Sequence, residues 1–165
     1  MVPSDEYDLC LESGRRALPW RTFKIELASM SWTFVISTGQ LSHDGMPVAV
    51  CYSGRGVGKN NPVCCSAQMG TLGADNFGPL PIGKYTIAAS EEDPRLGPIA
   101  MRLSPDPANQ MHGRAGFFIH ADSVAHPGEA SEGCIVPMHG SAGESGHQIR
   151  MMISASADRE LEVDA

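Results

Sequence analysis

Glycine and proline place the strongest constraint on what this chain can fold into. They number 18 and 12, or 30 of the 165 residues, which is about 18% where roughly 12% is usual. Both residues favour turns and interrupt helices. Apolar residues make up 42% of the chain and charged residues only 19%, which is typical of a folded globule and not of a disordered chain. We therefore expect one domain with many turns and little helix.

Short apolar runs between turn residues predict a mainly β fold. Aromatic and β-branched residues dominate these runs. The expected strands are residues 32–36, 47–52, 83–88, 99–103, 116–120, 134–136 and 161–163. Ile149, Met152 and Ile153 recur at helical spacing, which predicts one helix over residues 144–154. We expect a β-sandwich or barrel-like sheet over residues 32–165, preceded by an irregular extension (1–31) with a short helix at 4–11.

Charge and hydropathy exclude several classes of protein. The chain has 12 Lys and Arg against 19 Asp and Glu, a net charge of −7, and this balance argues against nucleic acid as a partner. No apolar stretch approaches the roughly 18 residues of a membrane span. The first residues are acidic where a signal peptide would be basic and then apolar. We expect synthesis in the cytoplasm without a classical export signal.

The five cysteines are an odd number, so at least one is unpaired if the others form bridges within the chain. They are Cys10, Cys51, Cys64, Cys65 and Cys134. A bridge between the adjacent Cys64 and Cys65 would be strained. If a bridge forms, we expect it between Cys51 and one of that pair. The alternative is that all five are buried or incidental thiols.

A histidine and a cysteine mark the segment with the clearest chemistry. His120 ends an apolar run, and Cys134 follows Gly133 in a predicted tight turn. A nearby imidazole can take the proton of a thiol and hold the thiolate as an ion pair. The N–H of Cys134, with that of Glu132 or Gly133, could hold a developing oxyanion. The alternative is a core cysteine beside a capping histidine.

This pattern resembles the active-site signature of the L,D-transpeptidase (YkuD-type) family, in which a histidine is followed after about a dozen residues by Ser/Thr-x-Gly-Cys. Residues 78–87 are similar to that family's Thr-Pro-x-Gly-x-Tyr/Phe-x-Ile strand entry. The resemblance covers residues 32–163 and points to a branch of short type VI secretion effectors. It implies an L,D-transpeptidase-like β-sandwich for the catalytic domain.

The resemblance also implies a role for each matching residue. Cys134 matches the nucleophile and His120 its base, and the main-chain carbonyl of Ala121 would orient the imidazole ring. Ser131 and Gly133 match the Ser/Thr and Gly of the signature. No metal or other cofactor is implied.

Two positions depart from the family pattern. Glu132 stands where a histidine is common, and Val136 stands where an Arg or Asn is associated with substrate grip. The side chains that we expect to contact substrate instead are Arg114, Arg102, His112 and Tyr52.

The substrate implied is the stem peptide of peptidoglycan, cut at the bond between diaminopimelate and the terminal D-Ala. The product would be a shortened peptide, an exchanged D-amino acid or a cross-link. Such a protein would be a secreted antibacterial toxin that acts in the periplasm of a target bacterium. Its further partners would be an immunity protein and a component of the secretion apparatus.

Two other readings remain. The first is a domain of the same fold that binds or supports the cell wall without catalysis. The second is a metal site built from His120, Asp122, His126 and Cys134, whose spacing matches neither a helical His pair nor a Cys-x2-Cys knuckle.

Overall fold

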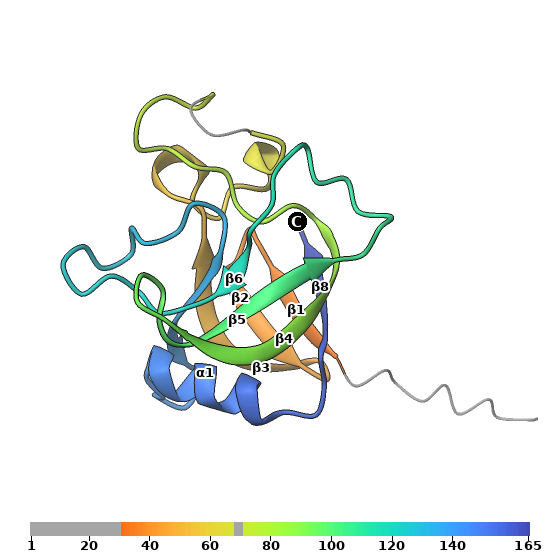
Figure 1. Ribbon diagram of the computed structural model, residues 1–165, viewed down its shortest axis with the longest axis vertical. Helices are drawn as coiled ribbons and strands as arrows, with labels where there is room; N and C mark the ends of the chain where they lie inside the picture. Colours follow the sequence, from red (N-terminus) through yellow and green to blue (C-terminus); the bar gives the residue numbers. More distant parts are fainter. Residues whose placement is uncertain (1–30, 68–70) are drawn as a thin grey trace, which may run out of the picture.

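The computed structural model describes residues 31–67 and 71–165. Within them, the strands form one closed barrel in the order β1-β2-β3-β7-β6-β5-β4-β8 (Figure 1). Their bounds are β1 Trp32–Val35, β2 Gln40–His43, β3 Met46–Ser53, β4 Gly83–Asp93, β5 Gly97–Pro105, β6 Phe118–Ile119, β7 Ile135–Gly140 and β8 Glu160–Asp164. Neighbouring strands are antiparallel, except that β1 is parallel to β8 and β6 is parallel to β7.

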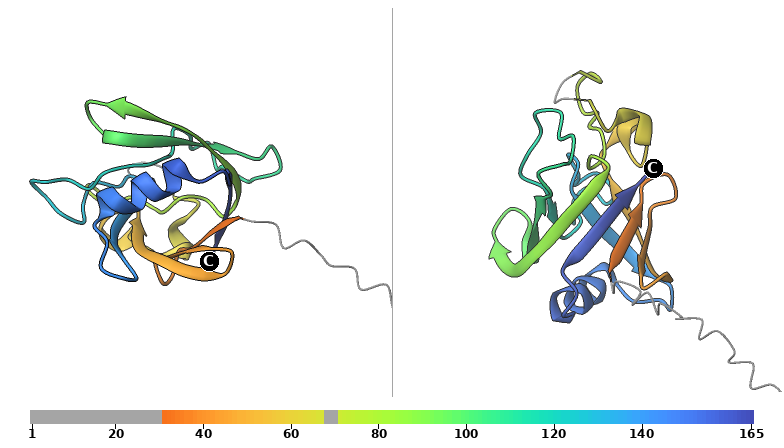
Figure 2. Two further views of the ribbon diagram at one scale, coloured as in Figure 1. Left: turned by 90° about the horizontal axis from the view of Figure 1, so that it is seen from below. Right: turned by 90° about the vertical axis from the view of Figure 1, so that its right-hand side faces the viewer.

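Helix α1 (Gly146–Ala155) covers one end of the barrel. It begins at a capping box in which Ser145 and Gln148 exchange side-chain and main-chain hydrogen bonds. Ile149 and Ile153 are fully buried, and the helix packs on β7 and β5. The loop segments 54–67, 71–82 and 106–117 lie at the opposite end (Figure 2). One end of the barrel is therefore closed by apolar packing, and the other carries the loops that can shape a site.

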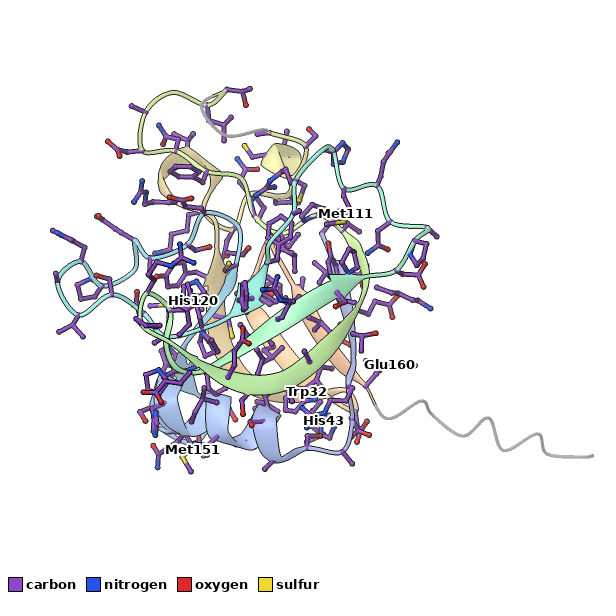
Figure 3. All side chains as sticks on the ribbon, viewed as in Figure 1. Trp32, His43, Met111, His120, Met151 and Glu160 are labelled. Atoms are coloured by element: carbon purple, nitrogen blue, oxygen red, sulfur yellow. The ribbon has the colours of Figure 1, made fainter. Side chains whose placement is uncertain are left out.

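The interior of the barrel is a packed apolar core (Figure 3). Buried residues alternate with more exposed ones most clearly along β1 and β8, as the two-residue period of a β-strand requires. The largest of the fully buried side chains are Trp32, Tyr52, Phe34, Ile36, Leu41, Leu80, Ile87, Met101, Ile119, Ile135, Ile149 and Ile153. The strands therefore form a rigid support for the loops.

The mainly β fold with one helix is confirmed, and of the two expected arrangements the strands form the barrel and not the two-sheet sandwich. The closure comes from β8, which pairs with β1 in parallel, Trp32 opposite Leu161. Strand β2 was not expected. It forms because Asp44 and Gly45, both with positive φ (51° and 76°), make the two-residue turn of a hairpin with β3.

The expected bridge from Cys51 is wrong. Cys51, Cys64, Cys65 and Cys134 are all free thiols. Cys51 is fully buried in the core on β3, while the sulfur of Cys65 lies 3.6 Å from the carbonyl oxygen of Leu80. Cys10 and the helix expected at residues 4–11 lie outside the described residues.

No helix in residues 31–67 and 71–165 combines the length and hydropathy needed to cross a membrane.

Candidate active site

The parallel pairing of β6 and β7 brings His120 and Cys134 to one place. Ile119 pairs with Ile135, so Cys134 lies opposite Phe118 on the neighbouring strand. Side chains two residues apart point to the same face of a sheet, so His120 projects from the same face as Phe118. The N–H of His120 donates to the carbonyl of Ile135 (3.1 Å). Both His120 and Cys134 line a cleft of about 830 Å³.

The imidazole of His120 is buried and fixed by its neighbour. Its Nδ1 lies 2.7 Å from the carbonyl oxygen of Ala121, so Nδ1–H donates there and Nε2 is left to exchange a proton. Burial lowers the pKa of His120 below its usual value, and the bond to Ala121 opposes that shift. The ring is therefore neutral at pH 7, which is the form that a general base needs.

The thiol of Cys134 is held in its protonated form. Burial raises its pKa to about 11, against the opposing effect of the Phe118 N–H, which donates to Sγ (3.3 Å). In the described part of the chain, no hydrogen bond joins Sγ to His120. These pKa shifts favour a neutral thiol beside a neutral imidazole at neutral pH. Catalytic hydrogen bonds often form only once substrate is bound, so the proton would move during attack.

The hydroxyl of Ser131 fixes the turn that carries the cysteine. Its Oγ accepts from the N–H groups of Gly54 (2.8 Å) and Gly133 (3.0 Å) and donates to the carbonyl of Cys134 (2.6 Å). The Gly133 N–H is therefore already used and does not serve as the expected oxyanion donor. The Cys134 N–H has no acceptor among the described residues and remains available.

A second buried hydroxyl supports the same turn from the barrel. The Oγ of Ser53, at the end of β3, donates to the carbonyl of Gly133 (2.9 Å) and accepts from the N–H of Leu80 (2.8 Å). Gly133 has a φ of 127°, and a Cβ there would meet the Arg114 guanidinium and the Phe117 ring. Only glycine fits this position.

Arg114 connects its own loop to two other loops around the cysteine. Its guanidinium stacks on the Phe117 ring, 5.1 Å from the ring centre. It also donates to four main-chain carbonyls, those of Cys65 (2.9 Å), Pro79 (2.6 Å), Gly78 (2.8 Å) and Glu132 (3.1 Å). Arg114 lines the cleft, but its donors are engaged with the protein itself.

Comparison with known families gives one match. A family model described as the Tlde1 domain matches residues 48–154. That match runs from β3 into α1, covers more than half of the chain, and includes both His120 and Cys134. The chain belongs to the Tlde1-domain family. Tlde1 domains are a family of type VI secretion effectors. No curated protein matches the chain.

Three of the side chains expected to contact substrate do not line the cleft of this Tlde1 domain. Tyr52 is fully buried, and its hydroxyl donates to Asp122 and accepts from the N–H of Ala130 (3.0 Å). Arg102 lies over the Phe118 ring, 4.5 Å from its centre. His112 is half-buried beside the cleft-lining Gly113.

Tyr52 instead orders the loop between His120 and Cys134. Its partner Asp122 also accepts from the N–H groups of Ser123 (2.8 Å) and Gly128 (2.8 Å). Asp122 therefore stabilises this loop and does not orient the imidazole, although it lies only two residues after His120.

Sequence reasoning missed several contributors to the Tlde1 site. The Phe118 N–H carries no side-chain signal, so only the strand pairing reveals it. Ser53 had a weak signal, a hydroxyl at the end of an apolar strand. Arg55 also lines the cleft, where it pairs with Asp75 (3.3 Å) and lies over the Phe77 ring.

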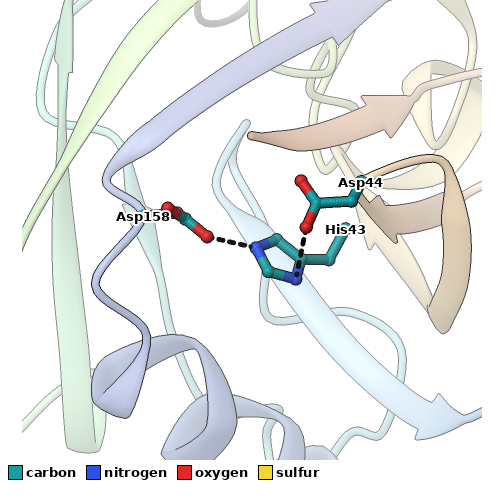
Figure 4. A group of neighbouring side chains, drawn as sticks. All are labelled: His43, Asp44 and Asp158. Carbon is teal, nitrogen blue, oxygen red and sulfur yellow. Dashed lines mark hydrogen bonds and ion pairs between the residues drawn. The ribbon is translucent and has the colours of Figure 1, made fainter. Parts of the chain in front are cut away.

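The side chains His120, Asp122, His126 and Cys134, considered above as metal ligands, are not grouped closely enough in the described structure to share an ion. Among the described residues, the group of potential ligands is His43, Asp44 and Asp158 (Figure 4). Asp158 lies 2.6 Å from Nε2 of His43, and Asp44 lies 3.8 Å from Nδ1. Because the two carboxylates approach different ring nitrogens, they do not converge on one ion. The group instead connects the β2–β3 turn to the segment before β8, and His43 stacks on Trp32.

The raised pKa of Cys134 predicts a pH dependence for its alkylation. The thiolate is the reactive form, so the rate should still be rising at about pH 10, where a thiol of ordinary pKa, about 8.5, would have levelled off. The measurement is the rate of iodoacetamide labelling, followed by mass spectrometry of the peptide that holds Cys134. A rate that is already constant from about pH 7 would indicate an ion pair with His120 instead.

Proposed function

We propose that this domain is a cysteine acyl-transferase that acts on the peptidoglycan stem tetrapeptide, at the bond between diaminopimelate and the terminal D-Ala. The observation that carries the proposal is the pair of Cys134 and His120, placed on one face of the β6–β7 pair and lining one cleft. The resemblance to L,D-transpeptidases supplies the substrate, and membership of a type VI effector family is consistent with a cell-wall target.

The first half-reaction forms a thioester. Sγ of Cys134 attacks the diaminopimelate carbonyl carbon while Nε2 of His120 takes the thiol proton. The oxyanion that develops accepts a hydrogen bond from the Cys134 N–H. The carbon–nitrogen bond then breaks, and His120 returns the proton to the leaving amine of D-Ala. The formation of the thioester needs no other reactant.

The second half-reaction resolves the thioester. His120 takes a proton from an incoming water or amine, whose oxygen or nitrogen attacks the acyl carbon, and Sγ leaves and recovers the proton. Water gives a tripeptide and makes the enzyme an L,D-carboxypeptidase. A free D-amino acid gives an exchanged tetrapeptide. Either outcome removes donors for normal cross-linking, which would make the protein toxic in the periplasm of a target bacterium.

An effector of this kind would need two further partners. One is an immunity protein that blocks the cleft in the producing cell, and the other is a component of the secretion apparatus that delivers the chain.

Mass spectrometry of purified tetrapeptide muropeptides incubated with the protein tests the reaction. We expect loss of D-Ala in buffer and a new C-terminal residue when another D-amino acid is added. Pretreatment with iodoacetamide should stop both reactions, and a chelator should stop neither. Binding to sacculi without any release of D-Ala would overturn the proposal and identify a wall-binding module.

A further inference from the structure

Three arginines line the cleft that holds Cys134, and they differ in how far their charges are engaged. Arg114 donates to four main-chain carbonyls. Arg55 pairs with the Asp75 carboxylate (3.3 Å) and donates to the carbonyl of Glu129 (3.4 Å). The remaining one is Arg95, whose side chain is 88% exposed.

Arg95 has a weakly held guanidinium on a firmly held turn. Its Nε lies 3.8 Å from Asp93, its partner among the described residues. That Asp93 carboxylate already accepts from the N–H groups of Arg95 (2.7 Å) and Leu96 (3.2 Å), which fix the turn between β4 and β5. An exposed ion pair of this length is worth little, so the guanidinium is free to bind another anion.

The turn that carries Arg95 is attached to the catalytic histidine's own strand. The carbonyl of Leu96 accepts from the N–H of Ala121 (3.1 Å), and Ala121 in turn fixes Nδ1 of His120. Arg95, Leu96 and His120 all line the cleft. Arg95 is thus on the His120 side of the cleft, where a leaving amine would collect its proton.

We propose that Arg95 binds the α-carboxylate of the amino acid that leaves from, or enters, the acyl-enzyme. This inference rests on the proposed function. In an amino acid the amine and the carboxylate are attached to the same carbon. An amino acid whose amine lies at Nε2 of His120 therefore has its carboxylate close by. An arginine fork can bind a carboxylate through two parallel hydrogen bonds.

This role sets the specificity of the reaction. Recognition of a free α-carboxylate confines the reaction to the terminal residue of the stem. The same contact would select free D-amino acids as acceptors in the exchange reaction.

The test compares two tetrapeptide substrates, one with a free C-terminal carboxylate and one with a C-terminal amide. The unaltered protein should prefer the free acid by about tenfold or more in kcat/KM, the scale of one charge-assisted pair. Arg95→Gln should lower kcat/KM for the acid by about that factor and leave the amide unchanged, while Arg95→Lys should keep part of the preference. Lys84→Gln, which removes one exposed charge outside the cleft, should change neither.

Two results would overturn this role for Arg95. One is an equal loss on both substrates in Arg95→Gln, which would indicate a structural effect. The other is an unchanged preference for the acid. Failure of the unaltered protein to release an amino acid from either peptide would instead overturn the proposed function itself.

Discussion

Replacing Cys134 with alanine should abolish release of D-Ala, with kcat reduced by at least about 10³-fold, the scale seen when a nucleophile is removed. Among the described residues, Cys134 is the thiol that lines the cleft. The loss should be in turnover and not in substrate binding, because the side chain is small and half-buried. The measurement is D-Ala released from tetrapeptide muropeptides, with substrate binding followed separately by calorimetry.

The matched control is Cys64→Ala. Cys64 is also half-buried, but it lies outside the cleft, so its removal should leave turnover within about twofold, as for a site distant from the chemistry. Thermal unfolding of both variants would show that the fold is retained. Release of D-Ala by Cys134→Ala at the unaltered rate would show that this thiol is not the nucleophile.

Local sequence patterns predicted most of the strands and the helix, but they did not predict which distant strands pair with each other. The apolar runs that form β1, β3, β4, β5 and β8 are local features of the sequence. Their composition and two-residue period were therefore sufficient to predict these strands. Closure into a barrel depends on β1 meeting β8 from the far end of the chain. A sandwich and a barrel share the same alternation of inward and outward residues, so sequence alone could not distinguish them.

The candidate site could also be predicted only in part from the sequence. The pairing of His120 with Cys134 could be proposed from their residue types and spacing, whereas the role of the Ala121 carbonyl came only from the resemblance to the L,D-transpeptidase family. The protonation states could not be predicted, because burial determines them. Tyr52 was expected at the substrate and is instead buried against Asp122. Contacts to main-chain groups, such as those of Ser53 with Gly133, leave almost no trace in a sequence.

Replacing Arg114 with lysine should lower kcat by about 10- to 100-fold and leave KM nearly unchanged. The planar guanidinium donates to carbonyls from two loops, those of Cys65 and Gly78 in one and that of Glu132 in the other. A lysine ammonium cannot span that arrangement, so the turn before Cys134 would shift. A displacement of about 1 Å of a reacting group costs about 100-fold in rate. Steady-state kinetics on the free-acid tetrapeptide would measure kcat and KM separately.

The split between kcat and KM distinguishes a positioning residue from a substrate contact. If Arg114 gripped the substrate, as the sequence suggested, Arg114→Lys would raise KM at constant kcat. The control is Arg159→Lys. Arg159 also donates to main-chain carbonyls, those of Ser154 (2.9 Å) and Ile153 (3.5 Å), but it lies beside α1, away from the cleft. Its replacement should lower the melting temperature without changing kcat, because the carbonyls that it contacts support no part of the nucleophile turn.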